Sequence, residues 1–115
     1  MTDETPHDRA LDGPVAAPDH HRVVFENDRI RVVETVIRAG DITPVHTHLA
    51  PHLLIFSSGS RFVRRDADGA VMFDTRLQGP DFAIPTHAWN EGTGPHILEN
   101  VGPDDILATA VELKP

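Results

Sequence analysis

The chain of 115 residues contains no cysteine and no tyrosine, and only one tryptophan. The absence of cysteine excludes disulfide bonds and metal sites built on thiolates. Any metal must therefore be held by nitrogen and oxygen ligands. Covalent catalysis has no support either, because the sequence shows no cysteine, no tyrosine and no serine, histidine and aspartate arranged as a catalytic triad.

A long hydrophobic run and an excess of basic residues are also missing. Eighteen acidic residues stand against ten basic ones, so the formal net charge is −8, which disfavours nucleic acid and anionic membranes as partners. The first twenty residues are polar and acidic, without the apolar stretch of a signal peptide or a membrane span. We therefore expect a cytoplasmic protein with neither a nucleic-acid nor a membrane partner.

The length matches one ordinary domain preceded by a short arm. Residues 1–20 are polar, contain prolines and lack a hydrophobic period, so we interpret them as a flexible N-terminal arm and residues 21–115 as the domain. In the domain, short β-branched runs alternate with turn residues, which is typical of an all-β sandwich or barrel with antiparallel strands. The predicted strands are Arg22–Glu26, Ile30–Arg38, Val45–His48, His52–Ser57, Arg61–Arg65, Val71–Leu77, Asp81–Ile84, His96–Asn100 and Ile106–Leu113.

Histidine is the residue type that points to chemistry, with eight in the chain. Side chains of a strand alternate between its two faces, so His46 and His48 point to the same side, about 6.6 Å apart along the strand. Two imidazoles at this separation can converge on one metal ion. His52 follows Pro51, which favours a turn or bulge that returns the next strand alongside the first.

Two segments resemble the sequence motifs of small single-domain cupins of the RmlC-like superfamily. The first motif is matched by Gly40, His46, His48, His52 and Gly59. The second motif is matched more loosely, by Gly79, Pro85, His96 and Asn100. The resemblance implies a cupin β-barrel, also called a double-stranded β-helix or jelly roll, with one divalent metal in its interior and a homodimer as the assembly.

By this resemblance the metal ligands are His46, His48, His52 and His96. Cupins commonly have a glutamate where this chain has His52, so the role of His52 stays open. The segment between Pro85 and His96 is longer than usual, and either His87 or His96 could supply the fourth ligand. We favour His96 because it shares one face of a predicted strand with Leu98, whereas His87 lies in a turn-rich segment.

Other polar and aromatic residues receive a structural interpretation. We expect solvated side chains at His7, His20 and His21. Strand alternation turns Glu99 away from His96. Trp89 is interpreted either as a cap on the barrel mouth or as a packing residue between subunits. A solvated face is favoured for Arg61, Arg64 and Arg65, with one inward-facing carboxylate binder among them as the alternative.

A ligand set made only of neutral imidazoles leaves a divalent ion with its full charge, which attracts anions. Imidazole suits transition metals, whereas magnesium and calcium prefer oxygen, so we expect iron first, then zinc, nickel and manganese. Two functions fit this chemistry. One is a metal-dependent enzyme that acts on a small anionic or carbonyl compound, dioxygenase-like or else a lyase or isomerase. The other is a non-catalytic module that binds a small molecule or the metal.

Overall fold

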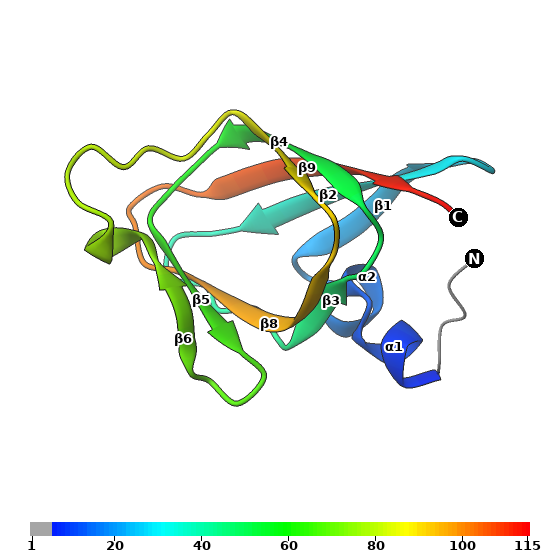
Figure 1. The fold of residues 1–115 in the computed structure, drawn as a ribbon, viewed down its shortest axis with the longest axis horizontal. Helices are drawn as coiled ribbons and strands as arrows, with labels where there is room; N and C mark the ends of the chain where they lie inside the picture. Colours follow the sequence, from blue (N-terminus) through cyan, green and yellow to red (C-terminus); the bar gives the residue numbers. More distant parts are fainter. Residues whose placement is uncertain (1–5) are drawn as a thin grey trace.

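The computed structural model describes residues 6–115, which form nine strands and three short helical segments (Figure 1). The helical segments are α1 (Pro6–Leu11), α2 (Gly13–Ala16) and the 3-10 turn η1 (Thr75–Leu77). The strands are β1 (His21–Glu26), β2 (Ile30–Ile37), β3 (His46–His48), β4 (His52–Ser58), β5 (Phe62–Asp66), β6 (Val71–Asp74), β7 (His87–Asn90), β8 (Thr93–Asn100) and β9 (Ile106–Leu113). These strands pair antiparallel, so the predicted all-β class is confirmed.

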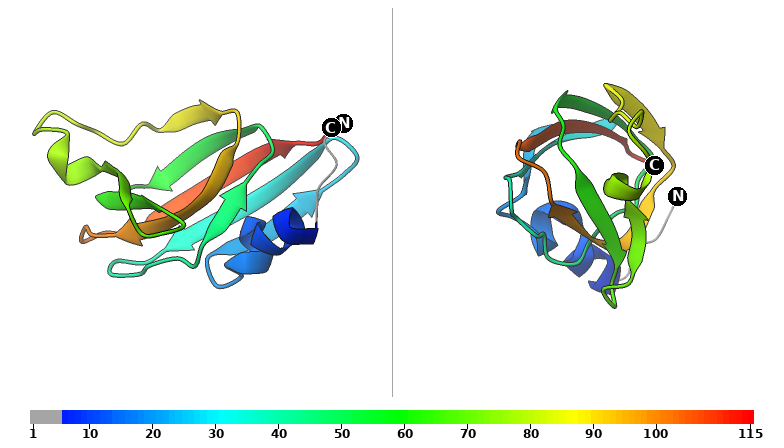
Figure 2. Two further views of the ribbon diagram at one scale, coloured as in Figure 1. Left: turned by 60° about the horizontal axis from the view of Figure 1, so that its bottom comes forward. Right: turned by 90° about the vertical axis from the view of Figure 1, so that its left-hand side faces the viewer.

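The strands form two sheets that curve around a common interior, as the right-hand view of Figure 2 shows. The larger sheet has the order β1-β2-β9-β4-β7, and the smaller sheet has the order β3-β8-β5-β6. From β3 onward the chain crosses from one sheet to the other at every connection except the hairpin between β5 and β6. Consecutive strands therefore face each other across the interior, which is the jelly-roll arrangement.

Strand β9 lies at the centre of the larger sheet, between β2 and β4. Its sequence alternates in burial, and Ile106, Ala108, Ala110 and Glu112 face inward. This is the period of a strand with one face on the core. The two alanines are too small to fill the space above them, and both line the cavity described below.

The predicted strands differ from the observed ones mainly between β6 and β8. The predicted strand Asp81–Ile84 does not form, because it lies between Pro80 and Pro85, which have no backbone N–H for a ladder. Residues His87–Asn90, interpreted as a loop, instead form β7 along the free edge of β4. The strand from Val71 ends at Asp74, whose side chain accepts a hydrogen bond from the backbone N–H of Arg76 and begins η1.

The segment that precedes the barrel packs against it. The sequence predicts a flexible arm over residues 1–20; residues 1–5 lie outside the described part, and most of residues 6–16 form α1 and α2. Gly13 and Ala17 are buried, and an isolated bridge joins Asp12 to Thr47 of β3. Both helices are short, and no helix within residues 6–115 is long and apolar enough to cross a membrane.

Candidate metal centre

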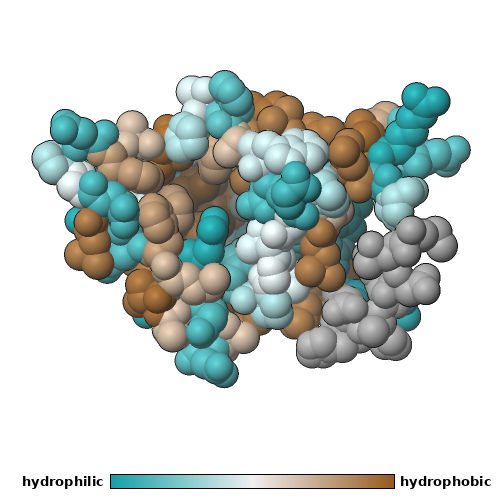
Figure 3. Space-filling view, viewed as in Figure 1, coloured by the Kyte–Doolittle hydropathy of each residue, from teal (hydrophilic) through white to brown (hydrophobic). Residues whose placement is uncertain are grey.

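Five histidines from four strands line one cavity of about 90 Å³ between the sheets. They are His21 of β1, His46 and His48 of β3, His52 of β4 and His96 of β8. The rest of the wall is mostly apolar and includes Leu54, Phe56, Phe62, Ile84, Leu98 and Ile106. The face shown in Figure 3 is hollowed near its middle, with hydrophobic residues on the left of the hollow and more hydrophilic residues on its right. The cavity thus combines a histidine cluster with an apolar wall.

Strand pairing brings the rings close together. His46 of β3 stands opposite His96 of β8 in the register, and their ring centroids are 4.3 Å apart. The centroid of His21 lies 4.5 Å from that of His46 and 4.9 Å from that of His48. His48 lies 5.6 Å from His96 and 5.9 Å from His52 by the same measure. Residues that are far apart in the sequence therefore form one continuous cluster.

Three of these histidines are spaced as a metal site requires. The ligand atoms of His21, His46 and His48 all lie within 4.8 Å of one another. Imidazole nitrogens bind transition metals at about 2.0–2.1 Å, so two of them on one ion are separated by at most about 4 Å. Closing the cluster onto an ion therefore needs shifts of less than about 1 Å, which side-chain rotation can supply.

Backbone carbonyls hold four of the rings in a defined tautomer. The Nδ1 atoms of His46, His52 and His96 each lie 2.8 Å from the carbonyl oxygen two residues earlier in the chain. Nδ1 of His21 lies 3.2 Å from the carbonyl of Ala17. Because a carbonyl can only accept a hydrogen bond, each Nδ1 carries the proton, which leaves Nε2 with a free lone pair for a metal.

His48 differs from the other four, because its buried Nδ1 has no hydrogen-bond partner within residues 6–115. A buried polar atom without a partner is costly, and such atoms in native proteins call for an explanation. A cation bound at Nδ1 of His48 would give this atom the partner that it lacks. The residues of the cluster therefore fit a metal.

Four histidines of the cluster, His21, His46, His48 and His96, are neutral at physiological pH because their pKa values are lowered. Burial is the main cause that lowers the pKa of His21 and of His96 to about 4, and their neighbouring histidines lower it further. Burial likewise lowers the pKa of His46 and, more strongly, that of His48. Neutral imidazoles are the form that binds metal, so no proton has to be displaced from these side chains at pH 7.

The structure corrects the interpretation of His21 and distinguishes between the two candidates for the fourth ligand. His21, expected to be solvated, is only 4% exposed and lines the cavity. The strand begins one residue earlier than predicted, and the alternation from His21 to Val23 was the signal that could have found it. His87 is exposed on β7, whereas His96 is buried in the cluster. His20 is half-buried near Asp41 and lies outside the cavity.

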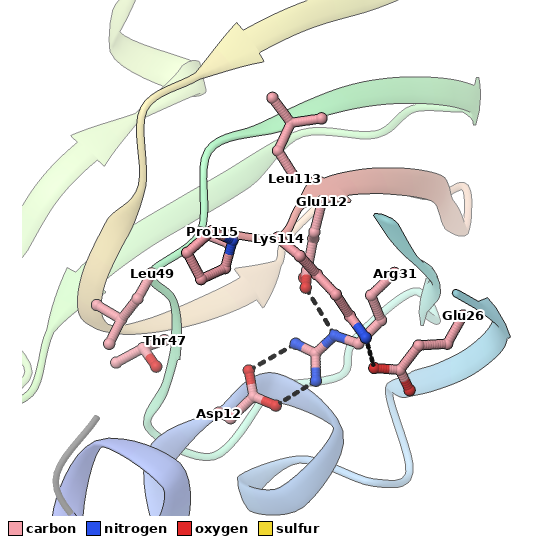
Figure 4. A pocket seen from close by; sticks show the side chains of 10 residues that line it. Asp12, Glu26, Arg31, Thr47, Leu49, Glu112, Leu113, Lys114 and Pro115 are labelled. Carbon is pink, nitrogen blue, oxygen red and sulfur yellow. Dashed lines mark hydrogen bonds and ion pairs between the residues drawn. The ribbon is translucent and has the colours of Figure 1, made fainter. Parts of the chain in front are cut away.

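An ion-pair network anchors the N-terminal segment beside this cluster (Figure 4). The guanidinium of Arg31 donates two hydrogen bonds to the carboxylate of Asp12, at 2.7 and 2.8 Å, and one from Nε to Glu112 at 2.7 Å. These three residues line a second cavity of about 270 Å³. Gly13 follows Asp12, and a Cβ at Gly13 would stand 2.9 Å from Cε1 of His48. The network therefore helps to define the wall behind His48.

Comparison with family models finds no match, and comparison with curated proteins finds none either. Solved structures are similar to the chain over most of its length. A cupin domain from Bordetella pertussis Tohama I matches with a TM-score of 0.63 and 16% identity, over 83% of this chain and 92% of the other. An RmlC-like cupin family protein with a double-stranded β-helix fold, from Methanocaldococcus jannaschii, matches with a TM-score of 0.56 and 11% identity, over 81% and 77%. A cupin superfamily protein from Desulfitobacterium hafniense DCB-2 gives 0.51 and 11%, over 83% and 76%.

Proposed function

We propose that this protein, whose fold is that of the cupins as the sequence motifs predicted, binds one divalent transition metal in its histidine-lined cavity. His21, His46 and His48 form the centre of the proposed site because their ligand atoms lie within 4.8 Å of one another. His96 and His52, which the sequence predicts as ligands, line the same cavity and are proposed to complete the coordination. The unpartnered Nδ1 of His48 is the observation that carries the proposal.

The donor set supports a transition metal in particular. No carboxylate lines the cavity. Magnesium and calcium prefer oxygen ligands and bind weakly to a site made only of imidazoles. Iron, zinc, nickel and manganese, in this order, stay our prediction for the ion. A bound ion of this kind supplies Lewis-acid or redox chemistry. The chain itself supplies preoriented imidazoles and a mostly apolar wall.

For the reaction we propose a dioxygenase-like enzyme, or a lyase or isomerase, that acts on a small anionic or carbonyl compound. The small size of the cavity, about 90 Å³, and its apolar wall support a small organic ligand. A non-catalytic binding module is the alternative, and it is favoured by the absence of a carboxylate, serine, cysteine or lysine side chain from the cavity lining. A cytoplasmic location stays part of this proposal.

Metal content tests the proposal most directly. Protein purified without chelator and without a histidine tag should contain about one equivalent of metal by elemental analysis. The double variant His46→Ala, His48→Ala should lose it, and His21→Ala should bind it more weakly. His87→Ala is the matched control, because His87 is exposed and lies outside the cavity. A wild-type protein that takes up no metal from iron, zinc, nickel or manganese solutions would exclude the proposed function.

Turnover then separates the enzyme from the binding module. The metal-loaded protein should consume dioxygen or convert at least one member of a panel of small organic acids. Tight binding of such an acid without any turnover would assign the protein to the alternative class.

A further inference from the structure

Arg64 lies on the inner face of β5, with its side chain on the wall of the histidine cavity. The register places Arg64 opposite Leu98 and Asp66 opposite His96, so Arg64 stands one step along the strand from the cluster. Its neighbours in the chain, Val63 and Arg65, do not line the cavity. Of the three arginines near β5, only Arg64 therefore faces the candidate metal centre.

The guanidinium of Arg64 has no counter-charge within residues 6–115. Its Nε is buried without a hydrogen-bond partner, and no carboxylate forms an ion pair with it among the described residues. Burial lowers the pKa of Arg64, as expected for a cation that is partly removed from water. By contrast, Arg65 pairs with Glu99 at 3.3 Å, and the half-buried Arg31 pairs with two carboxylates.

An unpaired cation in this position needs an anion. Arg64 is half-buried with a fully buried Nε, and a partly buried charge without a partner destabilises the fold. The lining of the cavity contains no aspartate or glutamate that could neutralise it. A divalent ion on neutral imidazoles would add two further positive charges. With a metal bound, the cavity would thus be positively charged within a chain of net charge −8.

We propose that Arg64 binds the carboxylate of a small organic acid inside the cavity, which makes this acid the ligand or substrate class of the proposed metal centre. Arginine presents a planar fork of donors that matches a carboxylate. The cavity of about 90 Å³ is smaller than the roughly 150 Å³ that accept benzene, so we infer an acid of about two to four carbons. Phe56, Phe62 and Ile84 provide the apolar wall for its carbon chain.

Calorimetric titration with propionate and with the neutral propionamide tests this assignment. The assignment rests on the proposed function only for the positive charge that a bound metal would add to the cavity. Wild-type protein should bind propionate at least ten times more tightly than propionamide, with and without metal. Arg64→Gln should weaken propionate binding about 10- to 100-fold, the usual range for a charged hydrogen bond. Arg64→Lys should give an intermediate loss. Arg65→Gln is the matched control and should bind propionate as wild type does.

Thermal stability gives a second readout that a structural arginine would not produce. Because Arg64 is half-buried, unpaired and has a buried Nε without a partner, the metal-free Arg64→Met variant should melt at the same temperature as wild type or higher. A structural arginine would instead lower the melting temperature when it is replaced.

Three results would overturn the assignment: equal binding of propionate and propionamide, unchanged binding in Arg64→Gln, or an equal loss in Arg65→Gln. Metal content separates this outcome from failure of the proposed function. If metal is bound but propionate binding does not depend on Arg64, the inference fails and the metal centre stands. If the protein takes up no metal and Arg64 still selects propionate, the metal centre fails and the carboxylate site stands.

Discussion

At the scale of single residues, hydrogen bonds to the backbone orient histidine rings of the cluster without a metal. The Nδ1 atoms of His46, His52 and His96 each contact the backbone carbonyl oxygen two residues earlier in the chain. The rotation of these rings is therefore restricted locally, and little side-chain entropy is left to lose on binding. His48 has no such hydrogen bond, so its ring is the one that metal binding should order most.

Gly13 controls the space behind His48. A Cβ at this position would lie 2.9 Å from Cε1 of His48 and 3.3 Å from Cγ of His21, so both rings would have to shift. We expect Gly13→Ala to lower metal affinity about tenfold, a typical effect of disturbing the support of a metal ligand. Competition with a coloured chelator measures this. Gly94→Ala serves as control, because a Cβ there meets no atom within 4 Å, and equal affinities of the two variants would contradict the prediction.

The stability of the metal-free protein should depend on the histidines. The folded-state pKa of His21 and His96 is about 4, against 6.5 for an ordinary histidine, so the unfolded chain takes up protons first as the pH falls. Their contribution to stability is complete above about pH 6.5 and is lost toward pH 4, on the order of 2 kcal/mol for each group after allowance for solvent screening. Urea denaturation in chelator at pH 7, 6 and 5 measures this change. His96→Gln should reduce the pH dependence, and a flat profile in wild type would refute the prediction.

At the scale of elements, the short strand β3 depends on its neighbours. It has three residues, pairs with β8 on one side, and is bridged on the other by Asp12 of the N-terminal segment. Arg31 of β2 binds Asp12 and Glu112 together, so one side chain joins the N-terminal segment to the centre of the larger sheet (Figure 4). The position of β3, and with it that of His46 and His48, is therefore fixed from both sides.

Removal of Asp12 tests this coupling. Asp12→Ala should lower the free energy of unfolding by about 2 kcal/mol, because it leaves the half-buried Arg31 with one carboxylate instead of two. It should also weaken metal binding, because the segment that supports His48 and His21 is released. Glu34→Ala is the control, since its ion pair with Arg22 is exposed and should contribute less than about 0.5 kcal/mol. Unchanged metal affinity in Asp12→Ala would show that the segment does not support the site.

At the scale of the whole molecule, an apolar row crosses the outer face of the larger sheet. The register pairs Phe25 with Val32, Val32 with Val111, Val111 with Leu53, and Leu53 with Trp89. Phe25 and Trp89, at the two ends, are both 52% exposed. Trp89 therefore does not cap the barrel mouth, and the interpretation as a packing residue remains. The homodimer implied by the cupin resemblance stays a prediction, and this row is where we expect the second copy.

A second copy fits this surface for electrostatic and geometric reasons. The five side chains of the row are uncharged although the chain carries −8, which favours contact between two copies here. At one end of the row, the carboxylate of Glu91 accepts a hydrogen bond from Nε1 of Trp89. A two-fold axis places the same row on both partners. Light scattering coupled to size exclusion should show a dimer that Trp89→Ser weakens. Leu77→Ser is the control, because Leu77 is 78% exposed and lies on η1, outside the row. A monomeric wild-type protein would contradict the prediction.

The local sequence pattern was enough to predict those features of the structure that depend on residues close together in the chain. Alternating β-branched runs determined the all-β class, and β9 begins and ends where the sequence predicts it. The spacing of His46 and His48 placed both on one face, because strand alternation acts over two residues. The motif around them also resembles that of the cupins, whose fold the solved structures confirm.

The remaining features depend on contacts between distant segments. Only the tertiary structure brought His21 into the cluster, distinguished the inward-facing Arg64 from Arg61 and Arg65, and formed β7 from a segment interpreted as a loop. The physical reason is the same in each case. Burial and pairing partners are set by which strands lie opposite one another across the barrel, and a periodic pattern contains no information about a partner fifty residues away.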